Sequence, residues 1–313
     1  MLAERLRDRG YRTAAVVANP WLRGEFGFEQ GFDTYVALDC GDLCDGKDVV
    51  REALGWLEKN SSSPFFLYLH FNDRLADAHR TKGFLQLFFE WDFQGALRSL
   101  ERSVELDPSS ALSHLWLSFC AWEGREDASL EALRKVQELD PLNLYIISVA
   151  AGVLDFWGRT EEAVRECRKA LDVDGNYLLA LYFIGGFYSR LGKHDEAVDA
   201  LAKAAALSSR APFYLGGLGW AQGRVGRRDD ARACLDELEE RSKTEYVAPL
   251  HRAIVHAGLG DKDRAFELLD EAVEKRNCWV AIPRVAFFVD LRSDPRFEEL
   301  LKRLGHPDGA QRR

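Results

Sequence analysis

The chain has 313 residues, a length that predicts one or two domains with a sizeable buried core. Its net charge of −9 argues against nucleic acid as the main ligand, because a phosphate backbone requires a clustered basic face. No stretch approaches the roughly 20 apolar residues of a membrane span, and the charged start MLAERLRDRG is not a signal peptide. With Met1 as the start, we therefore expect a cytoplasmic protein without a membrane span.

Residues 1–73 have the pattern of a small α/β segment. LAERLRDRG predicts a short helix ending at Gly10, and YRTAAVVAN predicts a buried strand. The Gly- and aromatic-rich run PWLRGEFGFEQGFDTY predicts a loop. DVVREALGWLEKN then predicts an amphipathic helix, and SSSPFFLYLHFND predicts a turn followed by a second buried strand. Helices and strands that alternate in this way predict a parallel sheet layer.

Three strings of this segment resemble the sulfatase and alkaline-phosphatase-like hydrolases: LAERLRDRGYRTAAVVANPWL, FGFEQGFDTY and PFFLYLHFND. The resemblance implies a fragment of that α/β fold. The family's Cys/Ser-x-Pro-x-Arg nucleophile motif is absent from the sequence, and Arg74 follows Asp73 where the family has Asp-Pro-His. Only His70 and Asp73 remain as reactive types, and such a pair at a strand end has a structural role in most proteins. We expect no catalysis from this chain as it stands.

Two strands and two helices bury little apolar surface. We therefore expect residues 1–73 to lean on the segment that follows, through the apolar cluster of Phe84, Leu87, Phe88 and Phe89.

The segment from Ala76 to Asn277 repeats with a period of 34 residues. Glycines, small residues and Leu or Cys recur in one register: Gly124, Gly158, Gly192, Gly226 and Gly260; Ala96, Ser129, Ala163, Ala197, Ala231 and Ala265; Leu100, Leu133, Cys167, Leu201, Leu235 and Leu269. The glycines predict left-handed turns between two helices, the small residues predict close helix packing, and the third series lies one turn further on the same face.

The string YFIGGFYSRLGKHDEAVDALAKAAAL resembles the tetratricopeptide repeat family, with Gly185, Tyr188, Gly192, Ala197, Leu201 and Ala204 at the motif's positions. The resemblance implies a mainly all-α superhelix of about six helical hairpins over residues 76–277, joined to the small α/β fragment of residues 1–73. The first repeat departs from the pattern because Trp91 occupies the turn glycine's position.

Residues 278–313 read as a C-terminal capping helix and tail. FEELLKRL is amphipathic and can cover the apolar face of the last repeat. Asp294 or Ser293 can cap this helix, with Pro295 in its first turn. A similar tail closes many bacterial repeat arrays.

The repeat resemblance also implies that the first helix of each hairpin lines a concave groove. The residues at the groove-facing positions are rich in aromatic residues and arginine, which dominate interaction hot spots. We expect Arg190 and Arg224 to be exposed. The chaperone-tail clamp of some family members is absent, since Ser118, Gly152, Gly186 and Trp220 occupy its positions. The predicted partner-binding groove consists of His114, Trp122, Tyr145, Phe156, Tyr182, Arg190, Trp220 and Arg224.

No motif indicates a cofactor or a metal. Cys40 and Cys44 lie four residues apart without the further ligands that zinc needs, and the glycines of GGLGWAQGRVG follow the repeat register, which favours helix contact over phosphate binding. The sequence thus predicts a non-enzymatic scaffold or adaptor that binds a protein, as an extended peptide or a helix, in the groove. Two alternatives stay open: the C-terminal portion of a sulfatase-like hydrolase whose catalytic part lies upstream of Met1, and an inactive fusion kept for its repeats. The partner and any self-association are not predicted.

Overall fold

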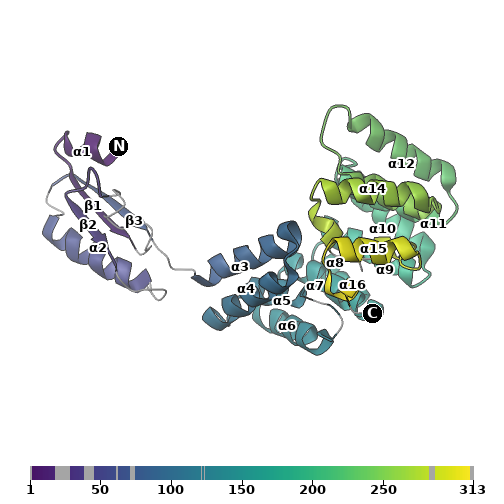
Figure 1. Cartoon of the computed structure of the whole chain (residues 1–313), viewed down its shortest axis with the longest axis horizontal. Helices are drawn as coiled ribbons and strands as arrows, with labels where there is room; N and C mark the ends of the chain where they lie inside the picture. The colour runs from purple at the N-terminus through teal and green to yellow at the C-terminus, as the bar shows by residue number, and fades with distance from the viewer. Residues whose placement is uncertain are drawn as a thin grey trace. The chain divides into compact units, whose positions relative to one another are not determined.

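The computed structural model describes residues 2–17, 29–38, 46–60, 63–70, 75–120, 122, 124–281 and 286–310. Cys40, Cys44, Asp73 and the side chain of His70 lie outside the described residues, so the predictions about them stay untested. The chain divides into two compact units, Met1–Ala78 and His79–Arg313 (Figure 1), which are called here the sheet unit and the array unit.

The sheet unit is a three-stranded parallel sheet with strand order β2-β1-β3. Its elements are α1 (Leu2–Arg7), β1 (Arg12–Val17), β2 (Thr34–Ala37), α2 (Gly46–Asn60) and β3 (Phe65–His70). The predicted α/β segment is confirmed. The loop predicted for residues 20–35 is wrong at its C-terminal end, which belongs to a strand. Thr34 and Tyr35 belong to β2, where Tyr35 pairs with Ala15 of β1. Three β-formers in succession, Thr34, Tyr35 and Val36, beside an apolar central strand favour extension of the sheet.

The two faces of this sheet differ in their cover. On one face, Val16 packs with Val49 and Ala53 of α2. On the other face, Phe32 lies over Phe66 and Tyr68, with ring centroids 6.2 and 6.4 Å apart. Tyr68 is 43% exposed. The core of this unit is therefore small, and one face is aromatic and partly open.

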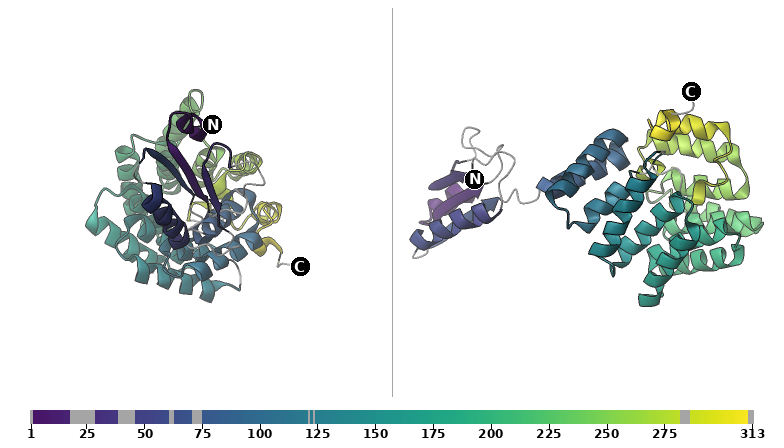
Figure 2. Two further views of the ribbon diagram at one scale, coloured as in Figure 1. Left: turned by 90° about the vertical axis from the view of Figure 1, so that its left-hand side faces the viewer. Right: turned by 90° about the horizontal axis from the view of Figure 1, so that it is seen from below.

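The described residues form six helical hairpins, all of which lie in the array unit except for the start of α3, and this confirms the predicted repeat architecture (Figure 2). Each hairpin pairs a first helix with a second helix, and the π-helix η3 (Gln86–Glu90) extends α3. The pairs are α3 (Leu75–Leu85) with α4 (Phe93–Leu106), α5 (Ala111–Ser118) with α6 (Glu126–Leu139), α7 (Leu144–Phe156) with α8 (Thr160–Val173), α9 (Leu178–Arg190) with α10 (His194–Leu207), α11 (Pro212–Arg224) with α12 (Arg228–Arg241), and α13 (Pro249–Leu259) with α14 (Lys262–Glu274).

The periodic glycines occupy turn positions whose backbone conformation favours glycine. Each of the five has φ between +74° and +85°, and a Cβ built on any of them meets no atom within 4 Å. The position therefore requires the left-handed region, which glycine adopts without strain. Trp91, at the same position of the first repeat, has φ +60°. The turn geometry is thus kept even where the side chain is unfavourable for it.

The other two periodic series form the packed interior, as predicted. Ala197 and Leu201 are buried, and Cys167 is buried where other repeats have Leu. The glycines of α11 serve helix contact: a Cβ on Gly223 would lie 2.7 Å from the backbone of Gly258 in α13. This close approach confirms the structural reading of the GGLGWAQGRVG run.

The aromatic cluster of the first hairpin packs against other residues of the array. The rings of Phe84 and Phe88 pack against Trp116 of α5, with centroids 4.9 and 5.6 Å away, and Leu87 is buried with them. Phe119 also lies beside Phe88, with ring centroids 6.1 Å apart, so this cluster has partners within the array. The expected packing of residues 1–73 on the cluster stays a prediction.

The C-terminal helix packs against the last repeats. In α15 (Pro295–Arg303), the Asp294 side chain accepts a hydrogen bond from the Arg296 backbone N–H. Phe297 and Leu300 join the core of the last repeats, and Arg296 pairs with Asp263 of α14 at 2.8 Å. Among the described residues, no helix is both long enough and apolar enough to cross a bilayer.

The remaining C-terminal elements are η4 (Cys278–Ala281), η5 (Ala286–Phe288) and α16 (Pro307–Ala310). Residues of the C-terminal part of the chain also contact the first hairpin. The Arg276 guanidinium lies 4.6 Å from the Trp91 ring centroid, and the Phe93 and His306 rings are 4.8 Å apart. The two ends of the array unit are therefore linked through its C-terminal residues.

Candidate functional site

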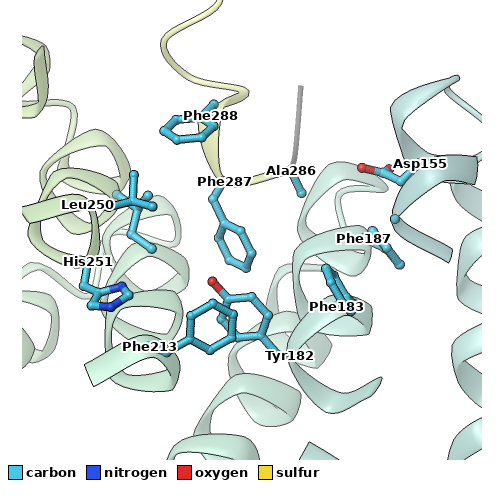
Figure 3. Close-up of a pocket in the computed structure, with 12 residues that line it drawn as sticks. Asp155, Tyr182, Phe183, Phe187, Phe213, Leu250, His251, Ala286, Phe287 and Phe288 are labelled. Carbon is cyan, nitrogen blue, oxygen red and sulfur yellow. The ribbon is translucent and has the colours of Figure 1, made fainter. Parts of the chain in front are cut away.

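The first helices of four successive hairpins, α7, α9, α11 and α13, enclose an apolar pocket (Figure 3). Residues of η5 complete its wall, and the space measures about 670 Å³ including its open mouth. We call it the aromatic pocket. Its lining consists of Gly152, Asp155, Tyr182, Phe183, Phe187, Phe213, Leu250, His251, Ile254, Ala286, Phe287 and Phe288.

Aromatic rings from α9 and α11 form one side of the pocket. Tyr182 packs against Phe213 at a centroid distance of 4.2 Å, and Phe183 stacks near Phe187 at 6.1 Å. Tyr182 is buried, which raises the pKa of its phenol and keeps it neutral. Gly152 leaves room opposite, since a Cβ there would meet only Phe183, at 3.8 Å. The pocket is shaped for an apolar group.

Two titratable groups lie at the edge of this apolar space. Burial lowers the pKa of His251 to about 4, so the imidazole is neutral at pH 7. Burial also raises the pKa of Asp155, while the Arg190 guanidinium and the Thr160 hydroxyl act in the opposite direction. Arg190 Nη1 donates to Asp155 Oδ2 at 2.9 Å, and Thr160 Oγ1 donates to Oδ1 at 2.9 Å. The lining therefore carries one carboxyl group, whose partners come from the array itself.

A C-terminal segment lies against the same helices. We call Ala286–Leu291 the return segment. The Phe287 ring lies 4.7 Å from Tyr182 and 4.8 Å from Trp220, and Figure 3 shows it pointing toward the pocket. Asp290 Oδ2 accepts a hydrogen bond from Trp220 Nε1 at 3.2 Å, and its carboxylate pairs with Arg224.

The return segment brings together three of the predicted groove residues: Tyr182, Trp220 and Arg224. Trp220 is completely buried. Arg190 and Arg224, predicted to be exposed, have side chains only 19% and 20% exposed. That prediction is wrong because each guanidinium has a carboxylate partner, Asp155 for Arg190 and Asp290 for Arg224.

The other four predicted groove residues lie apart from the pocket. Buried His114 donates from Nε2 to the Pro108 carbonyl at 3.0 Å, and buried Trp122 packs edge-on against Phe93. Phe156 packs edge-on against Trp157, and Tyr145 is 40% exposed. A role in partner binding stays a prediction for all eight residues.

Sequence reasoning missed most of the pocket lining. Phe183 and Phe187 are four residues apart on α9, a spacing that places them on one helix face. This spacing alone predicts that the two rings lie together. His251 and Phe287 had no local signal, because they come from a different repeat and from the non-repetitive C-terminal region.

In the part of the chain that the structure describes, no group of three or more His, Cys, Asp or Glu residues could hold a metal ion. His251 and His256, five residues apart on α13, have separate environments. His256 Nδ1 lies 3.1 Å from Asp261 Oδ2, whereas His251 faces the aromatic pocket.

Comparison with known proteins supports the repeat architecture. Models described as tetratricopeptide repeat match residues 178–210 and 217–279. The chain contains tetratricopeptide repeats. No curated protein matches the sequence. The residues that resemble sulfatases lie outside both matched ranges, so that resemblance gains no support.

Several solved repeat proteins are similar to the chain. PilW, a type IV pilus biogenesis factor, is 19% identical, with 64% of this chain and 92% of PilW covered and a TM-score of 0.49. A thermophilic TPR protein of Thermus thermophilus is 22% identical, with 62% and 98% covered and a TM-score of 0.48. A MamA protein is 22% identical, with 55% and 96% covered and a TM-score of 0.41. The assignment of repeats rests on the matched models and the helix geometry.

Proposed function

We propose that the protein is a non-enzymatic interaction scaffold, and that its first helices bind a partner's peptide or helix with an apolar side chain anchored in the aromatic pocket. The observation that carries this proposal is the pocket itself: an open apolar space between four consecutive first helices. Aromatic side chains in such pockets supply large contact area with few rotatable bonds. The matched repeats agree with a protein-interaction role.

Gly152 offers a direct test because it faces the pocket and has room for a side chain. A leucine at this position fills space that an anchor would occupy, and it suits an α-helix better than glycine does. We would select peptides on the full-length protein from a random displayed library and measure their dissociation constants by isothermal titration calorimetry. We expect Gly152→Leu to weaken their binding at least tenfold.

Gly55→Leu is the matched control. Gly55 lies in α2 of the sheet unit, and a Cβ there meets no atom within 4 Å. We expect this variant to bind the selected peptides as the unchanged protein does. Equal affinities for the unchanged protein and both variants, with helical circular dichroism preserved, would rule out the pocket as the anchor site.

A further inference from the structure

The return segment contacts the array through two side chains of different chemistry. Phe287 packs between the rings of Tyr182 and Trp220, and Asp290, three residues later, accepts from Trp220 Nε1 and pairs with Arg224. Both contacts reach first helices of the repeats. The segment thus meets the surface on which the proposed function places a partner.

The array provides a fitted position for this segment. A Cβ on Gly186 would lie 3.2 Å from Ala286 and 3.4 Å from Phe287, so glycine makes the space that they fill. The Arg224 guanidinium lies 5.2 Å from the Trp220 ring centroid, and both groups direct donors to one carboxylate. This arrangement recognises an aromatic ring and a carboxylate at a fixed separation.

The two arginines of this surface differ in the source of their charge partner. Arg190 pairs with Asp155, which belongs to α7 of the array. Arg224 pairs with Asp290, which belongs to the return segment. Removal of the return segment would leave the Trp220 Nε1–H and the Arg224 guanidinium without this acceptor. A ligand that replaces the segment must therefore bring an acidic group.

We propose that the position of the return segment is a binding site for a partner peptide that carries an aromatic residue and, three residues later, a carboxylate, and that the return segment competes for it from within the chain. This inference rests on the proposed scaffold function and specifies the chemistry of its partner. An intramolecular segment competes at an effective concentration in the millimolar range. A partner peptide therefore binds only when its affinity and concentration are high enough to displace the return segment.

The first experiment uses the chain's own nine-residue peptide AFFVDLRSD, residues 286–294, labelled with fluorescein. It is titrated into full-length protein carrying Phe287→Ala and Asp290→Asn, and into unchanged protein, with fluorescence anisotropy as the readout. We expect at least tenfold tighter binding to the double variant. Within the peptide, Phe287→Ala and Asp290→Asn should each weaken binding about tenfold, and so should Arg224→Gln in the protein.

The second experiment selects random displayed peptides on the double variant. We expect enrichment of an aromatic residue followed three residues later by Asp or Glu. If the double variant does not fold, Asp290→Asn alone serves both experiments, since it retains the Phe287 ring.

Three results would overturn the inference: no binding of the peptide to the folded variant, binding that ignores both peptide substitutions, or enriched peptides that lack an acidic residue. Dimers of the variant linked through exchanged return segments would also overturn it, because the occupant would then be a second copy. The Gly152→Leu test reports separately on the proposed function, because Gly152 lies on α7 in the open pocket. Suppose that Gly152→Leu abolishes binding of the selected peptides, while the Phe287 and Asp290 substitutions leave peptide binding unchanged. This inference would then be wrong, and the scaffold proposal would stand.

Discussion

The sheet unit and the array unit differ in how completely they bury their apolar surfaces. In the array unit, each hairpin covers its neighbour, and α15 covers the last one through Phe297 and Leu300. In the sheet unit, α2 covers one face of the sheet, whereas Tyr68 on the other face is 43% exposed. Parallel sheets are normally covered on both faces.

In a stacked repeat array, each hairpin buries its apolar face against the next hairpin. A short parallel sheet has no such neighbour for its second face. The core cluster of the sheet unit consists of Val16, Val49 and Ala53 with a few half-buried neighbours, while the clusters of the array unit extend from repeat to repeat. We therefore expect the array unit to be the more stable one.

The close contact between α11 and α13 should tolerate little added volume. Gly258→Val places side-chain atoms against the Trp220 carbonyl oxygen, where α11 and α13 touch. We expect a loss of about 3 kcal/mol or more in the free energy of unfolding of the array unit. Urea unfolding measures it, with Gly152→Ala as the control that should be neutral or slightly stabilising. A tolerated valine would mean that α11 and α13 are not in backbone contact.

The small core of the sheet unit should depend on single side chains. Val49→Ala removes a fully buried side chain from α2 beneath the sheet. We expect a loss of about 2 kcal/mol. Hydrogen exchange of β1 and α2 amides should then accelerate in the variant, while exchange in α9 and α10 stays as before. Equal acceleration in both units would show that they unfold as one and would contradict the comparison.

The array unit should also carry a pH dependence from His251. Burial lowers the pKa of this imidazole to about 4, against about 6.5 in an unfolded chain. The unfolded state therefore takes up the proton first as the pH falls, and the stability present above pH 6.5 is lost progressively toward pH 4. Between pH 7 and pH 5 we expect a loss of about 1–2 kcal/mol.

His251→Gln removes the titrating group and should flatten this pH dependence. Urea unfolding of the array unit at both pH values, in both proteins, isolates the contribution of His251 from that of Asp155, which the two proteins share. Identical pH slopes would place His251 in contact with solvent.

The smallest effect concerns the turn glycines. Gly226 has φ +79° and open space around its Cβ position. Gly226→Ala should destabilise the array unit by about 1 kcal/mol through backbone strain alone. Thermal unfolding measures this, and a stabilised variant would show that the turn does not hold the left-handed conformation.

The sequence could predict structural features that recur in every repeat and features that depend on neighbouring residues. The 34-residue glycine series predicted the turns, and Asp294 with Pro295 predicted the start of α15. The pocket could not be assembled in the same way. Trp220 and Asp290 are 70 residues apart, and Asp290 lies outside the periodic region. No periodicity relates such positions, so their meeting depends on how the C-terminal residues cross the first helices.

Contact mapping with a photoreactive residue in the full-length protein tests whether a peptide binds in the aromatic pocket. Phe183 lines the aromatic pocket, whereas Val173 is strongly exposed at the end of the second helix α8. With p-benzoylphenylalanine at either position, we would compare crosslinks to a selected peptide in the Gly152 and Gly152→Leu backgrounds. We expect a crosslink from position 183, loss of that crosslink with Gly152→Leu, and none from position 173. Crosslinking from position 173 alone would contradict this expectation and move the binding surface to the second helices.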